Sequence, residues 1–163
     1  MAEIKDKIKS PHALKKIVVR LKAKGKRIGF TNGCFDILHC GHIRYLQEAR
    51  RGVDILIAAL NDDSSVKRLK GRTRPIFPLK DRTKVVAGLE AIDYVTYFKE
   101  DTPAKIITII RPDIIIKGGD YRVKDIVGAD IVKSWGGRAR SVKYHKGYSV
   151  TSLIKSIARK SKH

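Results

Sequence analysis

Short runs of apolar residues alternate along the chain with stretches in which apolar residues recur every three or four positions. The short runs contain few polar residues, which is typical of strands buried on both faces of a parallel sheet. They predict five strands, at residues 27–31, 54–60, 94–98, 113–117 and 139–144. The longer stretches predict helices between the strands. We therefore expect an α/β fold with a Rossmann-like, parallel five-stranded sheet and helices on both faces.

The helical spacing is clearest before the first strand. There Leu14, Ile17, Val18 and Leu21 fall on one face of a helix expected over residues 11–24. The same spacing predicts helices around residues 43–49, 85–92, 106–110, 126–135 and 150–158. The length of 163 residues suits a single domain over residues 1–163, in which residues 1–26 form an N-terminal helical extension.

Two local signals refine this pattern. Thr102-Pro103 is expected to supply an N-cap followed by proline at the first helical position. Residues 67–78 are basic and contain two prolines, so they are predicted to form a long loop.

The chain carries a net charge of +20, and most of it lies at the two ends. Residues 1–27 hold ten Lys or Arg and two acids, and residues 131–163 hold nine and none, whereas residues 28–130 hold 17 and 14. The ends contain few aromatic residues that could stack on bases, so solvated helix faces explain the charge better than a nucleic-acid site. A basic nucleic-acid-binding protein remains the alternative from a different functional class.

The sequence shows no feature of an exported or membrane-bound protein. Its two cysteines form no disulfide framework, no apolar stretch approaches about 18 residues, and residues 1–9 contain no signal-peptide core. We therefore expect a soluble protein of the cytoplasm that does not bind a membrane.

Three of the predicted strands run into sequences suited to binding phosphate. These are residues 31–36 (Thr-Asn-Gly-Cys-Phe-Asp), residues 117–121 (Lys-Gly-Gly-Asp-Tyr) and residues 145–151 (His-Lys-Gly-Tyr-Ser-Val-Thr). Glycines let backbone amides approach a phosphate closely, while hydroxyls, lysines and helix N-termini supply further donors. Since ligands of such sheets bind beyond the carboxyl ends of the strands, we expect the functional site there.

The strongest local signal is His39-Cys40-Gly41-His42, placed directly before a predicted helix. Two imidazoles three residues apart at a helix N-terminus can reach one anion, and Gly41 leaves room for it. The alternatives are a structural role as a helix cap and a zinc site that uses Cys34, His39, Cys40 and His42. The spacing disfavours zinc, because adjacent His and Cys rarely bind the same metal ion. No P-loop or G-x-G-x-x-G motif is present.

Residues 33–42, Gly-Cys-Phe-Asp-Ile-Leu-His-Cys-Gly-His, resemble the signature of the cytidylyltransferase-like nucleotidyltransferases, G-T/C-F-D-x-x-H-x-G-H. The resemblance covers residues 24–157. Residues 61–63, 66–71, 74–76, 100–103, 116–121, 126–129 and 136–137 are similar to one branch, the D-glycero-D-manno-heptose 1-phosphate adenylyltransferases, which make ADP-heptose for lipopolysaccharide core. This resemblance implies AMP transfer from ATP to that sugar phosphate, with release of pyrophosphate.

The resemblance also implies which residues form the site. His39 and His42 would hold the α-phosphate, and Lys70 would be a further catalytic residue. Asp36 would organise the turn, and Lys67 or Lys70 would reach the triphosphate from the basic loop. The implied nucleotide-binding residues are Thr31, Asn32, Gly33, Cys34, Phe35, Asp36, His39, His42, Lys67, Arg82, Lys117, Gly118, Asp120, Ser149, Val150 and Thr151.

Within that set, Arg82 would contact phosphates, with a surface helix charge as the alternative. Asp120, with Lys117 and Gly118, would border the nucleoside, with a turn residue as the alternative for Asp120. Ser149 and Thr151 would bind the β- and γ-phosphates. Val150 departs from the Ser-Thr-Thr of the family and removes one hydroxyl donor. Lys146 stands where related cytidylyltransferases have an arginine, and it cannot supply a bidentate guanidinium.

The resemblance implies further partners. They are ATP, a sugar phosphate and Mg²⁺, which the triphosphate itself would mainly hold, so that no protein metal site is expected. A homodimer and a separate sugar kinase that makes the acceptor are also expected. Within the superfamily, a CTP-dependent glycerol-3-phosphate cytidylyltransferase and an FMN adenylyltransferase remain alternatives.

Overall fold

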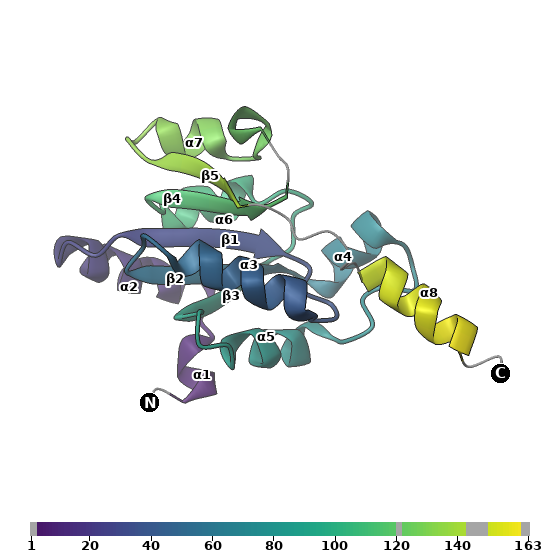
Figure 1. Cartoon of the computed structure of the whole chain (residues 1–163). Helices are drawn as coiled ribbons and strands as arrows, with labels where there is room; N and C mark the ends of the chain where they lie inside the picture. The colour runs from purple at the N-terminus through teal and green to yellow at the C-terminus, as the bar shows by residue number, and fades with distance from the viewer. Residues whose placement is uncertain (1–2, 120–121, 143–149, 161–163) are drawn as a thin grey trace.

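Five parallel strands form the centre of the molecule, in the order β3-β2-β1-β4-β5 (Figure 1). The computed structural model describes residues 3–119, 122–142 and 150–160. The strands are β1 (Ile28–Gly33), β2 (Ile55–Asn61), β3 (Tyr94–Phe98), β4 (Ile114–Gly118) and β5 (Arg138–Val142). The fold class expected from the sequence is confirmed.

Helices cover both faces of the sheet because the apolar runs of the strands must be buried on both sides. Helices α2, α6 and α7 pack on one face, around Phe30, Ile57 and Ile115. Helices α3 and α5 pack on the other, around Leu56, Ala58 and Ile116. The helices are α1 (Ile4–Lys7), α2 (Pro11–Ala23), α3 (Cys40–Arg50), α4 (Asp63–Lys70), α5 (Leu79–Ala87), α6 (Ala104–Ile110), α7 (Ala129–Lys133) and α8 (Val150–Lys160), with a 3-10 turn, η1, at Val123–Asp125.

The N-terminal helical segment belongs to the core of the domain. Leu14 and Val18 of α2 are buried against β3 and α6. Upstream of α2, Ile8 forms a parallel bridge with Val95 of β3, and the Lys7 amine donates to the Ile92 carbonyl at 2.8 Å. Residues 3–26 therefore complete one face and one edge of the sheet.

Four of the expected element boundaries were wrong. Residues 67–70 lie in α4, because Asp62 caps this helix by accepting from the Ser65 amide at 2.8 Å, so the loop is confined to residues 71–78. Helix α5 ends at Ala87, and Ile92 is buried although it lies beyond the helix. Helix α7 starts only at Ala129, after Gly128 with φ of 92°. In α6, Pro103 is the N-cap and Ala104 the first helical residue.

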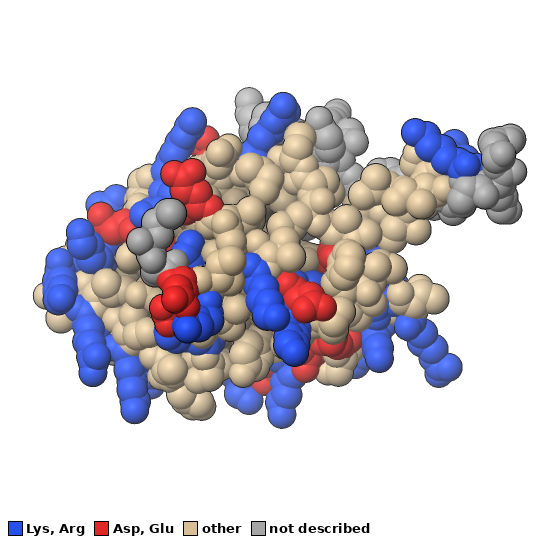
Figure 2. All heavy atoms as spheres, turned by 90° about the horizontal axis from the view of Figure 1, so that it is seen from below, with Lys and Arg blue, Asp and Glu red and all other residues tan. Residues whose placement is uncertain are grey.

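Basic and acidic side chains are interspersed on one face of the molecule. On the face shown in Figure 2, Lys and Arg side chains project around the outline, and Asp and Glu side chains lie between them in several places. None of the helices within residues 3–119, 122–142 and 150–160 has the length and apolar character needed to cross a membrane.

Candidate active site

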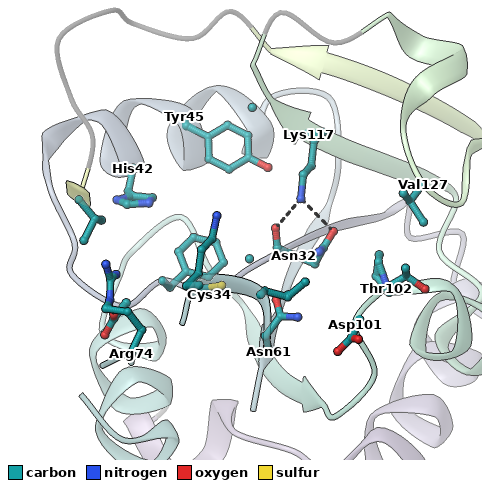
Figure 3. A pocket seen from close by; sticks show the side chains of 18 of the residues that line it. Asn32, Cys34, His42, Tyr45, Asn61, Arg74, Asp101, Thr102, Lys117 and Val127 are labelled. Atoms are coloured by element: carbon teal, nitrogen blue, oxygen red, sulfur yellow. Dashed lines mark hydrogen bonds and ion pairs between the residues drawn. The ribbon is translucent and has the colours of Figure 1, made fainter. Parts of the chain in front are cut away.

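A pocket of about 590 Å³ opens at the carboxyl ends of β1, β2 and β4 (Figure 3). This is the edge at which the sequence predicted the site. Its described walls come from residues within 32–45, 61–74 and 101–103, from residues 117–118 and 125–127, and from Val150. Of the expected site residues, the pocket brings together Asn32, Gly33, Cys34, Phe35, Asp36, His39, His42, Lys70, Lys117, Gly118 and Val150.

Asp36 fixes the loop that closes one side of the pocket. Its carboxylate accepts hydrogen bonds from the amides of Ile76 and Phe77, at 2.7 and 3.1 Å, and pairs with the Arg74 guanidinium. Its side chain is only 1% exposed. Asp36 therefore organises residues 74–77 and not only its own turn. Arg74, which also lines the pocket, owes its place there to this ion pair.

His39 and His42 lie side by side at the N-terminus of α3, with ring centroids 4.0 Å apart. The backbone N–H of His39 donates to Nδ1 of His42 at 3.4 Å. In the neutral imidazole of His42, the proton is therefore assigned to Nε2, which can donate to an anion. Desolvation lowers the pKa of both histidines, and together with the charge of His39 it lowers the pKa of His42 to about 4.

Helix α4 brings Lys70 to the pocket, whereas Lys67, one turn earlier, does not line it. The helix is fastened to the segment after β3 by Ser65, whose hydroxyl donates to the Glu100 carbonyl at 2.9 Å. Arg68 adds an ion pair to Asp101 at 2.7 Å. The amine of Lys70 therefore projects from a helix held at two points.

Lys117, at the end of β4, lies across the pocket from His42 (Figure 3). Its amine donates to the backbone carbonyl and the side-chain carbonyl of Asn32, at 3.2 and 3.4 Å. Desolvation lowers the pKa of Lys117; the interaction with Cys34 opposes this shift, and the charge of Lys70 adds to it. The next residue, Gly118, makes room for the ring of Tyr45, which would lie 2.9 Å from a Cβ at that position.

Two expected phosphate ligands lie behind the pocket in this structure. Thr31 is fully buried, and its hydroxyl is hydrogen-bonded to that of Tyr45. Arg82 is 2% exposed, and its guanidinium donates to the carbonyls of Cys34, Asn61 and Phe77 and to Asp63. Arg82 therefore ties the ends of β1 and β2 to the 71–78 loop. A direct contact of Arg82 with phosphate stays a prediction.

The remaining expected residues belong to the C-terminal part of the site. Val150 begins α8 and lines the pocket. Thr151 follows in the same helix, and its side chain lies outside the described residues, as do Asp120, Lys146 and Ser149. Their contacts with a nucleotide stay predictions.

Several lining residues were not singled out from the sequence. Tyr45 lies one helical turn after His42, so the face of α3 that carries the histidines could have indicated it. Asn61, Asp101, Thr102 and Val127 lie in segments that resemble the heptose branch, but the sequence did not mark them as lining residues, because they come from loops and strand ends brought together only by the fold.

The described residues fit a magnesium ion that arrives with a nucleotide. Among them, no group of three or more His, Cys, Asp or Glu could hold a metal ion. Each carboxylate that lines the described part of the pocket is paired with an arginine: Asp36 with Arg74, Asp101 with Arg68 and Asp125 with Arg122. Phosphate oxygens would therefore supply most of the ligands that Mg²⁺ requires.

Comparison with known proteins agrees with this geometry. The family model described as cytidylyltransferase-like matches residues 30–154, and thus all of the described pocket. This chain belongs to the cytidylyltransferase-like family. The resemblance of residues 33–42 to the signature of that family is confirmed.

Curated relatives place the chain within the family more closely. Bifunctional protein HldE of Trichlorobacter lovleyi is 48% identical over 93% of this chain and 31% of that protein. The HldE of Geobacter sulfurreducens is 46% identical over the same shares. The chain thus spans about a third of the length of these relatives.

Two solved structures share the fold. The lipopolysaccharide core biosynthesis protein of Thermoplasma volcanium aligns with a TM-score of 0.62 and 29% identity, over 76% of this chain and all of that one. A pantoate-beta-alanine ligase of Francisella tularensis aligns with the same TM-score at 16% identity, over 86% of this chain and 67% of that one. The second likeness shows the fold alone.

Proposed function

We propose that this chain transfers AMP from ATP to D-glycero-D-manno-heptose 1-phosphate, giving ADP-heptose and pyrophosphate. One observation carries the proposal: the paired imidazoles of His39 and His42 stand at a helix N-terminus inside the pocket of a cytidylyltransferase-like domain. The heptose branch is supported by the relatives, which are named bifunctional protein HldE and lipopolysaccharide core biosynthesis protein.

The reaction requires little general acid–base catalysis by the protein. A phosphate oxygen of the acceptor attacks the α-phosphorus of ATP, forming one P–O bond, and the bond from the α-phosphorus to the bridging oxygen of pyrophosphate breaks. The nucleophile is already ionised at neutral pH, so the protein mainly positions the two anions and stabilises the charge that develops between them.

The two histidines supply donors for that charge. In the neutral form that a lowered pKa favours, His42 keeps Nδ1 bonded to the backbone and aims its Nε2 proton at the α-phosphate. The positive end of α3 acts in the same direction. These donors are in place before the substrate arrives, so little reorganisation is needed during the reaction.

Cations beside the histidines would hold the rest of the triphosphate. Lys70 projects from α4, Arg74 is held by Asp36, and Ser149 and Thr151 are proposed to reach the β- and γ-phosphates. Mg²⁺ bound to the triphosphate would neutralise part of its charge. Gly118 and Asp120 are proposed to border the adenosine.

The proposal also covers the oligomeric state, the localisation and the partners of the enzyme. We propose a homodimer in the cytoplasm that binds neither a membrane nor a specific nucleic acid, and that receives its acceptor from a sugar kinase. Size-exclusion chromatography with light scattering tests the oligomeric state.

The proposal is tested by a matrix of substrates with pyrophosphate release as the readout. ATP and CTP are each combined with heptose 1-phosphate, glycerol 3-phosphate and FMN, in the presence of Mg²⁺. Turnover with ATP and heptose 1-phosphate should exceed every other combination, and mass spectrometry should identify ADP-heptose. Faster turnover of CTP with glycerol 3-phosphate, or of ATP with FMN, would assign the chain to another branch. Salt-sensitive retention on DNA without any turnover would favour a nucleic-acid-binding protein.

A further inference from the structure

Among the described residues, no anion matches the ammonium group of Lys117 in the pocket. This amine projects from the end of β4 into the space between β1 and α3, and its two acceptors are the oxygens of Asn32 (Figure 3). Both are uncharged, and both lie at the long end of the hydrogen-bond range. Within the described part of the chain, Lys117 forms no ion pair.

A second uncompensated ammonium group lies near the first. Lys70 lines the same pocket and likewise forms no ion pair within the described residues. Its charge adds to the desolvation that lowers the pKa of Lys117. Two like charges in a partly desolvated pocket are unfavourable unless an anion joins them. The pocket is therefore built for more than one anionic group, or for one that spans both amines.

The two amines come from different walls of the pocket. Lys70 is the last residue of α4 and precedes the loop that holds Arg74. Lys117 lies at the end of β4 directly beside Asn32, across the pocket from His42 and Arg74 (Figure 3). The histidines, Lys70 and Arg74 line the part of the pocket that we propose for the triphosphate, which carries its own Mg²⁺. A nucleoside placed at Lys117 would bring no negative charge to its amine.

We propose that Lys117 binds the phosphate group of the acceptor and places its oxygen opposite the α-phosphorus of ATP. This inference rests on the proposed function, because it assumes a phosphate monoester as the nucleophile. The ligand of this subsite is the dianion of a sugar phosphate. Asn32 holds the amine in place, and the sugar extends toward Asp101 and Thr102, whose oxygens can pair with its hydroxyls.

The test is a Lys117→Met variant compared with wild type and with Lys105→Met. Methionine keeps the length of the side chain and removes the charge, so the apo protein should be no less stable in urea. Lys105 is a surface lysine paired with Glu100, at 65% exposure, and serves as the matched control. Lys117→Arg restores a cation at the same position.

We expect the KM for heptose 1-phosphate to rise about 10- to 100-fold in Lys117→Met, the usual effect of losing a charged hydrogen-bond donor. The Kd for MgATP, titrated without acceptor, should change less than about threefold. Lys117→Arg should recover part of the acceptor KM, and Lys105→Met should match wild type. A raised KM for the acceptor with a nearly unchanged Kd for MgATP would distinguish a loss of acceptor binding from a general loss of structure.

Two results would overturn the inference while leaving the proposed function intact. One is an unchanged acceptor KM in Lys117→Met. The other is a Kd for MgATP that weakens as much as the acceptor KM, which would assign Lys117 to the nucleotide. If wild type makes no ADP-heptose, the proposed function fails, and calorimetry with heptose 1-phosphate and a non-hydrolysable ATP analogue then decides the inference. Equal binding by wild type and Lys117→Met, or no binding by either, would refute it.

Discussion

Replacing Asp36 with asparagine should destabilise the domain as well as its active site. The carboxylate is almost completely buried and accepts from Arg74 and from two backbone amides, Ile76 and Phe77. Asparagine keeps the size of the side chain and one carbonyl oxygen for the amides. Its NH₂ group, however, would face the donors of Arg74, whose side chain is only 14% exposed.

The expected loss of stability follows from how deeply Asp36 and Arg74 are buried. Removing one partner of a buried ion pair costs about 3–5 kcal/mol, because the other charge stays buried without compensation. The slight exposure of Arg74 lets water relieve part of this, so we expect a loss of about 2–4 kcal/mol. With a urea slope of about 2 kcal/mol per M, the midpoint of unfolding should fall by about 1–2 M. The kcat/KM for ATP should fall too, since the 71–78 loop loses its anchor.

Urea denaturation followed by circular dichroism measures the effect, with Asp101→Asn as the control. Asp101 also pairs with an arginine, Arg68, but both side chains are about half exposed, so that change should cost below about 1 kcal/mol. In an Arg74→Met background, Asp36→Asn should cost much less, because no cation is then left unpaired. Additive costs in this cycle, or a loss below about 1 kcal/mol in Asp36→Asn alone, would refute the reasoning.

Three further predictions concern the histidines and the cysteines. His39→Ala or His42→Ala should lower kcat by about 10²–10³ without unfolding the protein, and near-normal turnover by both folded variants would contradict their role at the phosphate. The Cys34→Ser, Cys40→Ser double variant should keep its activity, and elemental analysis of wild type should find less than stoichiometric zinc. Because the folded pKa of His42, about 4, lies below its ordinary value of 6.5, the folded state binds fewer protons, and stability should fall as the pH drops from about 6.5 toward 4. Over the same pH range, the free energy of unfolding of His42→Asn should fall less than that of wild type, by about 1 kcal/mol after allowance for solvent exposure. An equal fall in both proteins would contradict His42 as a source of the pH dependence.

The strands could be predicted because burial on both faces requires a short, nearly continuous run of apolar residues in the sequence. The run at Tyr94–Phe98 was placed correctly at both ends, and the other strands to within two residues among the described residues. Helix α4 was missed because its sequence is polar and basic. Its stability depends on the Asp62 cap and on contacts of Ser65 and Arg68 with the segment after β3, which is more than 30 residues away in the chain.

The functional site was predictable where its chemistry is local in sequence. His39 and His42 belong to one helical turn, so their spacing alone places both imidazoles at one end of α3. The ion pair of Asp36 and Arg74 joins residues 38 positions apart, and no periodic pattern links them. The polar wall that includes Asn61 and Asp101 depends in the same way on the order of the strands.

Arg82 shows why a cation near a phosphate motif cannot be assigned from sequence alone. A guanidinium group has five N–H donors, and in a buried position each of them requires an acceptor. In this protein the carbonyls that end β1 and β2, the carbonyl of Phe77 and the carboxylate of Asp63 supply those acceptors. Arg82 thus acts on the pocket through the backbone that carries Cys34 and Asn61, whereas Lys70 and Lys117 form no ion pair within the described residues and are proposed to bind a ligand. The number of acceptors around each cation, which only the folded chain defines, separates the residues that shape such a site from those that bind in it.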